Sequence, residues 1–213
     1  MPLLDQIAFF REFRSRFETT GSILPSSRFL ARAMTGPLRE HPRTAPLRIL
    51  EIGPGTGAVT GTILGQLRPQ DRFDLVEINE NFVALLRQRF ETDPAWKKVA
   101  PQSTLHCCPL QEFPTTGQYD VIVSGLPFNN FPVPLVESLV AASWDLLAPG
   151  GTYSFFEYMF VRPIRCTLSN RADRERLSAI EAFMQSRFRE SRFRRNWVFA
   201  NIPPAWVQHL RKS

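Results

Sequence analysis

The residues best suited to chemistry in this chain are alternating glycines that follow an apolar run. The motif consists of Glu51, Gly53, Gly55, Thr56 and Gly57. Glycine adopts positive φ angles and lets a ligand approach the backbone closely. A helix that begins behind such a loop offers unpaired N–H groups to the ligand. The pattern predicts a strand, a loop and a helix over 47–67 that hold a nucleotide-like cofactor.

A second acidic residue lies where a group that binds ribose hydroxyls is expected. Glu77 ends the run 73–77 and is followed by Ile78. It lies about 20 residues beyond the glycine loop, and a carboxylate accepts hydrogen bonds from two hydroxyls at once. The glycine spacing differs from the G-x-G-x-x-G pattern of NAD-binding loops. An ordinary glycine-rich turn is the simplest alternative.

With Glu51, the loop resembles the first motif, E-x-G-x-G-x-G, of class I S-adenosylmethionine (SAM) methyltransferases. The resemblance implies that SAM is the cofactor, that S-adenosyl-L-homocysteine is the product, and that the loop residues, Glu77 and Ile78 contact SAM. It also places Cys108, Pro109 and Leu110 where these enzymes bracket the adenine ring. The usual aspartate is absent there, so Cys108 or its backbone would have to replace it.

A fourth segment, 124–129, is suited to an attacking amine. It contains Ser124, Gly125 and Phe128 and resembles the [N/D/S]-x-P-[F/Y] motif of methyltransferases that act on nitrogen. In that motif a polar side chain and backbone carbonyls hold the amine, and an aromatic face stabilises positive charge. Ser124 and Gly125 are also expected to contact SAM. A proline turn with a packed phenylalanine is the alternative.

The elements that must position these residues alternate between strand and helix patterns, as in a doubly wound α/β sheet. Segment 147–151 resembles the L-x-P-G-G turn before strand five of class I methyltransferases. The resemblance implies a Rossmann-like sheet of seven strands, with the last inserted antiparallel and helices on both faces. We expect strands near 47–52, 72–77, 103–108, 119–124 and 152–158, two more within 191–210, a turn at 148–151, and helices over 57–67, 80–91, 133–147 and 172–187.

Residues 1–43 form a predicted helical extension before a methyltransferase domain at 44–213. Phenylalanines and leucines recur at helical spacing over 3–17, with arginines between them. A basic amphipathic helix of this kind can lie at the headgroup boundary of an anionic membrane. Packing on the sheet edge, or closure over SAM, are the alternatives. A serine-capped helix follows from Ser26 and Ser27, and loops are expected at 36–37 and 41–43.

Composition restricts the partners and the compartment. The 213-residue chain has a net charge of +6, which favours an anionic membrane surface or nucleic acid as partner, although a generally basic enzyme is also compatible. The three cysteines show no metal-binding spacing and fit a reducing cytoplasm, so no metal is expected. No membrane-spanning run or signal peptide is evident. We expect a monomer at the inner face of the membrane.

Two other segments resemble one family of these enzymes, the bacterial phospholipid N-methyltransferases. Residues 21–34 resemble its N-terminal signature, 201–207 resemble its N-[LI]-P-P-A-x-V segment, and 124–127 its strand-four motif. The resemblance implies SAM-dependent methylation of the phosphatidylethanolamine amine towards phosphatidylcholine. It also places Ser26 and Ser27 among the residues that contact SAM. A second basic group, suited to a lipid phosphate or to a solvated helix face, comprises Arg162, Arg165, Arg171, Arg174 and Arg176.

The implied reaction needs a neutral amine in line with the sulfonium methyl group. Tyr158 or Glu157, at the end of the fifth strand, could take the amine proton. We favour Tyr158, because neighbours on a strand face opposite sides. Ser124 and Phe128 would hold the amine, and an aromatic wall is expected from Phe128, Phe131, Phe156 and Phe160.

Three alternatives remain open from the sequence. An rRNA adenine N-methyltransferase would account for the basic charge and the 124–129 motif. It predicts a further RNA-binding module after the last strand, whereas this sequence ends soon after the expected seventh strand. Nucleic acid is therefore the less expected partner. An enzyme acting on another amino-lipid, such as an ornithine lipid, fits the same motifs. A SAM-binding protein without catalysis is the third alternative.

Overall fold

The computed structural model describes residues 27–42, 44–114, 117–159 and 171–213. The predicted amphipathic helix over 3–17 therefore lies outside the described residues, as do Ser26, Phe160, Arg162 and Arg165. The proposed boundary between an extension and a methyltransferase domain at residue 43 stays a prediction.

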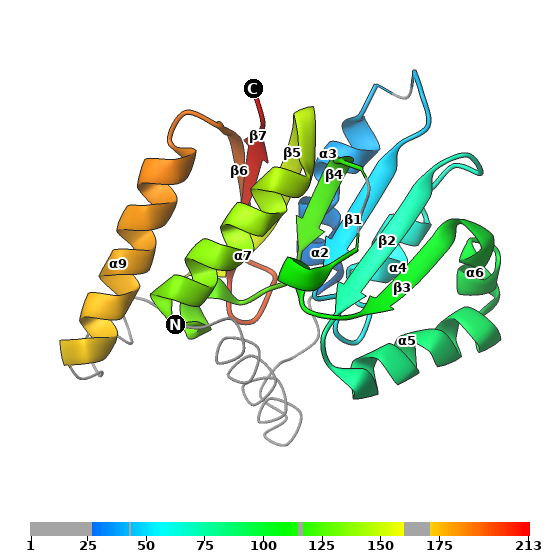
Figure 1. The fold of residues 1–213 in the computed structure, drawn as a ribbon, viewed down its shortest axis with the longest axis horizontal. Coiled ribbons are helices and arrows are strands. Elements are labelled where there is room, and N and C mark those ends of the chain that lie inside the picture. The colour runs from blue at the N-terminus through cyan, green and yellow to red at the C-terminus, as the bar shows by residue number, and fades with distance from the viewer. Residues whose placement is uncertain (1–26, 43, 115–116, 160–170) are drawn as a thin grey trace.

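Within the described ranges the chain forms a seven-stranded sheet in the order β3-β2-β1-β4-β5-β7-β6 (Figure 1). Strands β1 to β5 run parallel, and β7 runs antiparallel to both of its neighbours. This topology confirms the predicted seven-stranded Rossmann-like sheet. The strands are β1 Arg48–Ile52, β2 Arg72–Glu77, β3 Ser103–Cys107, β4 Tyr119–Ser124, β5 Leu147–Tyr158, β6 Arg192–Val198 and β7 Ala205–Arg211.

Helices cover both faces of the sheet, as predicted. Side chains of α7 and α9 pack on one face, and those of α2 to α6 pack on the other (Figure 1). Each face therefore has its own apolar core, which is why the central parallel strands are apolar almost throughout. The helices are α2 Arg28–Met34, α3 Gly36–Glu40, α4 Thr60–Leu64, α5 Glu80–Thr92, α6 Pro94–Lys97, α7 Val133–Leu146 and α9 Arg171–Phe188.

Three elements differ from the sequence prediction by more than one residue at an end. Helix α4 spans only Thr60–Leu64, because Gly57 has a φ of 82° and the chain turns until Val59. The loop predicted at Gly36 is the start of α3, where Pro37 lies in the first turn and so removes no intrahelical hydrogen bond. Strand β5 begins at Leu147, so the predicted turn at 148–151 is part of an irregular strand start with a register shift against β4.

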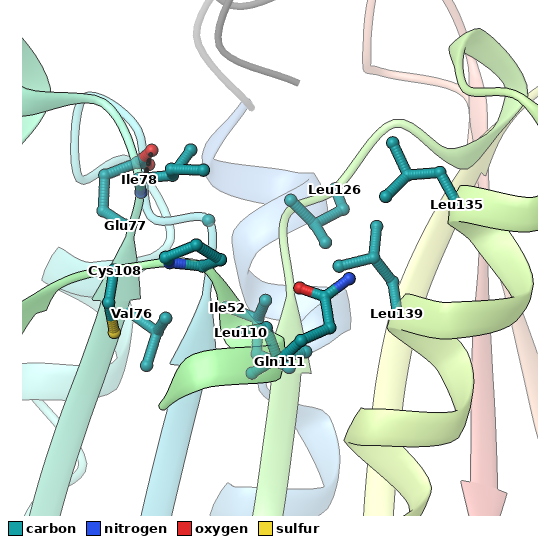
Figure 2. Close-up of a pocket in the computed structure, with 12 residues that line it drawn as sticks. Ile52, Val76, Glu77, Ile78, Cys108, Leu110, Gln111, Leu126, Leu135 and Leu139 are labelled. Carbon is teal, nitrogen blue, oxygen red and sulfur yellow. Dashed lines mark hydrogen bonds between the residues drawn. The ribbon is translucent and has the colours of Figure 1, made fainter. Parts of the chain in front are cut away.

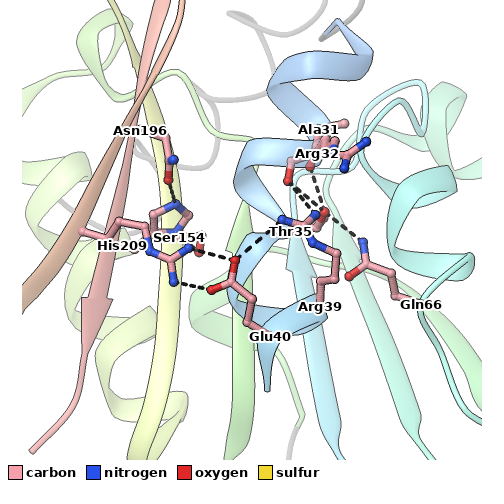
Figure 3. Close-up of polar contacts among 10 residues, drawn as sticks. Ala31, Arg32, Thr35, Arg39, Glu40, Gln66, Ser154, Asn196 and His209 are labelled. Carbon is pink, nitrogen blue, oxygen red and sulfur yellow. Dashed lines mark hydrogen bonds and ion pairs between the residues drawn. The ribbon is translucent and has the colours of Figure 1, made fainter. Parts of the chain in front are cut away.

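A polar cluster inside the sheet joins β5, β6 and β7 (Figure 3). His209 is fully buried, and its ring nitrogens lie 2.8 Å from Ser154 Oγ and 2.8 Å from Asn196 Oδ1. Since Asn196 Oδ1 only accepts, the ring donates from Nε2 and accepts the Ser154 hydroxyl at Nδ1. Burial, and then the charge of Arg194, lower the pKa of His209 to about 4, so the ring is neutral.

An ion pair on the surface ties the helices before β1 to this part of the sheet. Both guanidinium NH groups of Arg194 donate to Glu40, at 3.1 and 2.6 Å. Glu40 ends α3 and Arg194 lies on β6, so the contact joins segments that are 154 residues apart. The hydrogen bond from Arg194 lowers the pKa of Glu40.

Candidate functional site

The glycine loop has the backbone geometry that its sequence predicts. Gly53, Gly55 and Gly57 have φ angles of 66°, 58° and 82°, all in the left-handed region that favours glycine. A Cβ atom on Gly53 would lie 2.6 Å from Cδ2 of Leu126, so that side chain would have to shift. The loop therefore needs glycine above all for its conformation.

That segment approaches the loop backbone to backbone. The N–H of Gly125 donates to the carbonyl of Ile52 at 2.8 Å, and a Cβ atom on Gly125 would lie 2.6 Å from the carbonyl oxygen of Gly53. Because β1 and β4 are parallel neighbours, with Ile52 opposite Ser124, their carboxyl ends meet at one edge. The segments predicted to bind SAM and the acceptor are thus in direct contact.

Glu77 holds the glycine loop from the end of β2. Its carboxylate is almost fully buried, and three backbone N–H groups donate to it at 3.0 Å: Ile78 and Asn79 to Oε1, and Gly55 to Oε2. The carboxylate is therefore fixed beside Gly55 before any ligand binds. A rigid, buried acceptor at this position is suited to ligand hydroxyl groups.

A pocket that is open to solvent on one side lies beside Glu77 (Figure 2). Apolar side chains from four strand ends and α7 form most of its wall, which suits a flat heterocycle. The predicted residues Gly53, Glu77, Ile78, Cys108, Pro109 and Leu110 all line it, together with Ile52, Val76, Gln111, Leu126, Leu135 and Leu139.

Gln111 is a polar wall residue that the sequence did not reveal. It lies in the short 3₁₀ turn Leu110–Glu112, and its Nε2 donates to Ser138 Oγ on α7 at 3.0 Å. Figure 2 shows its amide among the apolar side chains of the wall. Gln111 thus supplies a hydrogen-bonding group beside the position where the usual aspartate is absent. The only available signal was that it follows Leu110 directly.

Glu51 lies on β1 and, unlike Glu77, does not reach the pocket. Its side chain is 1% exposed and does not line the pocket. Burial raises the pKa of Glu51 to about 8; nearby Thr60 opposes the shift and Glu77 adds to it. Although Thr60 is close, neither carboxyl oxygen of Glu51 has a hydrogen bond within the described part of the chain. A buried carboxyl without a partner fits a ligand that brings a donor or a positive charge.

The predicted acceptor residues after β4 are buried beside the pocket and do not line it. Ser124 is fully buried, and its Oγ accepts a long hydrogen bond, 3.4 Å, from the N–H of Leu126. Phe128 is 2% exposed and packs edge-on against Phe155, with ring centroids 5.7 Å apart. Their predicted roles in holding the amine stay predictions.

The two predicted proton acceptors at the end of β5 face opposite sides of the sheet. Tyr158 packs edge-on against Phe156 on the side of α2, and burial raises the pKa of its phenol, which therefore stays neutral at pH 7. Glu157 accepts a hydrogen bond from Gln208 Nε2 at 2.9 Å and lines a groove under α9. Neither residue lines the pocket beside Glu77, so the structure does not bring them together with it.

Ser27 joins the two segments that carry the more specific sequence signatures. Its Oγ caps α2 by accepting from the N–H of Leu30 at 3.2 Å, and its own N–H donates to Oδ1 of Asn201 at 3.1 Å. Ser27, within the 21–34 signature, thus contacts Asn201, the first residue of the 201–207 signature. Whether Ser27 also contacts SAM stays a prediction.

Two kinds of feature are absent from the described part of the chain. Among the described residues, no group of three or more His, Cys, Asp or Glu side chains could hold a metal ion. None of the helices that the structure describes is long and apolar enough to cross a membrane.

Comparisons with known proteins point to one reaction class. Residues 49–151 match a family described as a methyltransferase domain. The chain is 30% identical over 150 residues to an ornithine lipid N-methyltransferase of Singulisphaera acidiphila; the match covers 70% of this chain and 76% of the relative. It is 28% identical over 141 residues to ribosomal RNA small subunit methyltransferase A of a Synechococcus species, covering 64% of this chain but 47% of that protein.

The fold is also found in solved structures of similar enzymes. The N-methyltransferase NodS of Bradyrhizobium japonicum, in complex with S-adenosyl-L-homocysteine, superimposes with a TM-score of 0.57 at 16% identity. The superposition covers 87% of this chain and 88% of NodS. At this identity the likeness concerns the fold.

Proposed function

Since this chain belongs to the class I SAM-dependent methyltransferases, we propose that it transfers a methyl group to the amine of a membrane lipid headgroup. Phosphatidylethanolamine is our first candidate acceptor, and an ornithine lipid is the second. The observation that carries the proposal is the similarity to an ornithine lipid N-methyltransferase over 70% of the chain. The resemblance of residues 21–34 and 201–207 to phospholipid N-methyltransferases supports the same acceptor class.

The residues at the carboxyl edge fit SAM. Glu77 would bind the ribose hydroxyls, and Ile78, Pro109 and Leu110 would enclose the adenine ring in the apolar pocket. The loop that the positive φ angles of Gly53 and Gly55 shape would pass under the amino-acid part. A positive charge of this ligand beside the glycine loop would lower the pKa of the buried Glu51 carboxyl and favour its ionised form. When bound, SAM supplies a methyl group on a positively charged sulfur.

The chain has to bind the acceptor amine and favour its neutral form. A free amine of this type has a pKa near 10 in water, and an apolar site beside a positive charge lowers that value. The Ser124–Pro127 segment presses against Gly53, so an amine bound there would lie next to the cofactor loop. Tyr158 and Glu157 remain the candidates to accept the proton, directly or through water.

The proposal extends to the place where the enzyme works. We expect a monomer in the cytoplasm that binds the inner membrane face, with residues 1–43 as an extension that contacts lipid or closes over the site. The net charge of +6 supports binding to anionic lipid. Arg174 and Arg176 on α9 are further basic residues for this contact with anionic lipid. Arg176 Nη1 also donates to the carbonyls of Asn129 and Phe131, at 3.0 and 2.9 Å, and so ties α9 to the segment after β4.

The test is incubation of the full chain with labelled SAM and three acceptors in separate reactions. These are vesicles with phosphatidylethanolamine, vesicles with ornithine lipid, and ribosomal RNA. Label in phosphatidylethanolamine supports the first candidate, and label only in ornithine lipid corrects the headgroup while keeping the class. Label in RNA alone would refute the lipid proposal and favour the similarity to the ribosomal RNA enzyme.

A further inference from the structure

The end of β6 and the turn before β7 expose large apolar side chains to solvent. Trp197, Phe199 and Ile202 are 58%, 64% and 74% exposed, and we call these three residues the hairpin patch. Turns usually carry glycine, asparagine, aspartate, serine or proline. The rings of Trp197 and Phe199 lie against each other, with centroids 5.8 Å apart, yet both stay largely exposed. A cluster of exposed apolar side chains marks a surface for interaction.

The hairpin patch lies at the same edge of the sheet as the cofactor site. Ala205, the first residue of β7, pairs with Tyr158, the last residue of β5, so the turn before Ala205 is at the carboxyl edge (Figure 1). Ser27, at the start of α2, donates to Asn201 in the turn, which places Phe29 at that edge as well. Phe29 is 47% exposed.

Two arginines lie close to the patch. Residues 196–204 contain no charged side chain, while Arg195 lies just before them with its guanidinium 5.6 Å from the ring centroid of Trp206. On α2, the guanidinium of Arg28 lies 4.9 Å from the ring centroid of Phe29. Apolar side chains at a tip with arginines behind them match an anionic bilayer, where aromatic rings enter the headgroup region and arginines stay near the phosphates.

We propose that the hairpin patch inserts into the surface of an anionic membrane and so presents the carboxyl edge of the sheet to the lipid headgroups. The proposal rests on the proposed function, because a lipid amine must reach the cofactor from the bilayer. A second copy of this chain suits the patch less well. A stable dimer buries roughly 800 Å² on each partner, which is more than three side chains at a tip provide, and two basic surfaces would repel.

The test compares vesicle binding of full-length variants without turnover. The probe is vesicles of phosphatidylcholine and phosphatidylglycerol, which contain no amine substrate of the proposed class. Trp197→Ser, Phe199→Ser and Ile202→Ser are combined in one variant, and Phe199→Ser alone is a second that changes a single exposed side chain. Phe193→Ser is the matched control, since Phe193 is 39% exposed on the same strand but near its other end, beyond Arg194.

We expect the single variant to lower the vesicle partition coefficient about tenfold and the combined variant to lower it further, in line with the loss of buried aromatic area. The Phe193→Ser control should bind as the unchanged chain does. SAM binding and the melting temperature of each variant establish that the fold is retained. Equal partitioning of all folded variants, or a dimer that dissociates when the patch is removed, would overturn the proposal.

The outcome separates this inference from the proposed function. Vesicle binding that depends on the hairpin, without methyl transfer to either lipid, would leave the inference intact and refute the function. If a hairpin variant binds vesicles normally and transfers methyl groups to lipid, the inference is refuted and the proposed function is supported.

Discussion

The two halves of the carboxyl edge are built differently. Around β1, β2 and β4, backbone segments touch each other: Gly53 lies against Gly125, and Glu77 is held by three N–H groups. Around the β6–β7 hairpin, large side chains stand in solvent, and Tyr158 and Glu157 point to opposite faces. The first half is fixed before a ligand arrives, whereas we propose that the second contacts the membrane. We therefore expect substitutions in the first half to affect folding and SAM binding, and those in the second to affect the lipid.

The largest effect is expected at the contact between the two loops. Gly125→Ala places a Cβ atom 2.6 Å from the carbonyl oxygen of Gly53, and this oxygen cannot move without displacing the cofactor loop. We expect destabilisation of about 3 kcal/mol or more, as for overpacking in a core, together with a loss of SAM binding. Thermal unfolding and calorimetric titration with SAM measure the two effects.

Gly61→Ala is the matched control, because a Cβ atom on Gly61 in α4 meets no atom within 4 Å. It should preserve SAM binding and raise stability by up to about 1 kcal/mol. Equal behaviour of the two alanine variants would show that the loop contact is not needed.

The buried carboxyl of Glu51 gives the first half an unusual pH dependence. The folded protein keeps this proton up to about pH 8, whereas the unfolded chain releases it near 4.5. Stability from Glu51 is therefore present below 4.5 and is lost as pH rises towards 8, by up to about 1.4 kcal/mol per pH unit. The free energy of unfolding in urea, measured for the wild type and for Glu51→Gln between pH 4.5 and 8, checks this pH dependence. The glutamine variant should lack this slope; if both proteins show the same slope, the assignment is wrong.

His209, in the second half, has the opposite sign. Its pKa is lowered to about 4 in the folded protein from 6.5, so the unfolded chain binds the proton first as the pH falls. Stability from the neutral ring is present above 6.5 and is lost as the pH falls to about 4, again by up to about 1.4 kcal/mol per unit. Acid unfolding of His209→Gln should be less steep than that of the wild type over this range. An unchanged acid profile would contradict the buried neutral ring.

Glu77→Gln tests the carboxylate of the first half. The amide keeps the shape but loses the charge and an acceptor oxygen, so SAM affinity should fall about 30- to 100-fold, corresponding to one or two charge-assisted hydrogen bonds. Glu80→Gln, on the exposed start of α5, is the control and should bind SAM normally. Calorimetric titration separates the two, and normal affinity of Glu77→Gln would remove Glu77 from the ribose site.

The smallest effect is expected where α2 meets the hairpin. Ser27→Ala removes the cap of α2 but keeps the backbone N–H that donates to Asn201. It should lower stability by about 1 kcal/mol and leave SAM affinity unchanged. Asn201→Ala removes the acceptor of that hydrogen bond, and it should weaken vesicle binding if the hairpin depends on α2. A large loss of SAM affinity in Ser27→Ala would instead support its predicted contact with the cofactor.

The sequence predicted the first half better than the second, and there are physical reasons. The parallel strands are buried on both faces, so each appears in the sequence as an apolar run whose ends predict the ends of the strand. For β2 and β4 the predicted and observed residues are the same. The glycine spacing and Glu77 are local patterns. Contacts between distant segments left no such pattern in the sequence, as with the hydrogen bond from Gln111 to Ser138 on α7 or the approach of Gly125 to Gly53. The short α4 was missed because the positive φ of Gly57 delays the helix.

The central claim is that this methyltransferase acts on a lipid amine. Mass spectrometry of vesicles that contain phosphatidylethanolamine and ornithine lipid, after incubation with SAM and the full chain, tests it most directly. We predict that one of these lipids gains methyl groups on its headgroup nitrogen, and that Glu77→Gln slows this gain strongly at low SAM concentration. Unchanged headgroups in both lipids, with methylated adenine in ribosomal RNA under the same conditions, would contradict the claim.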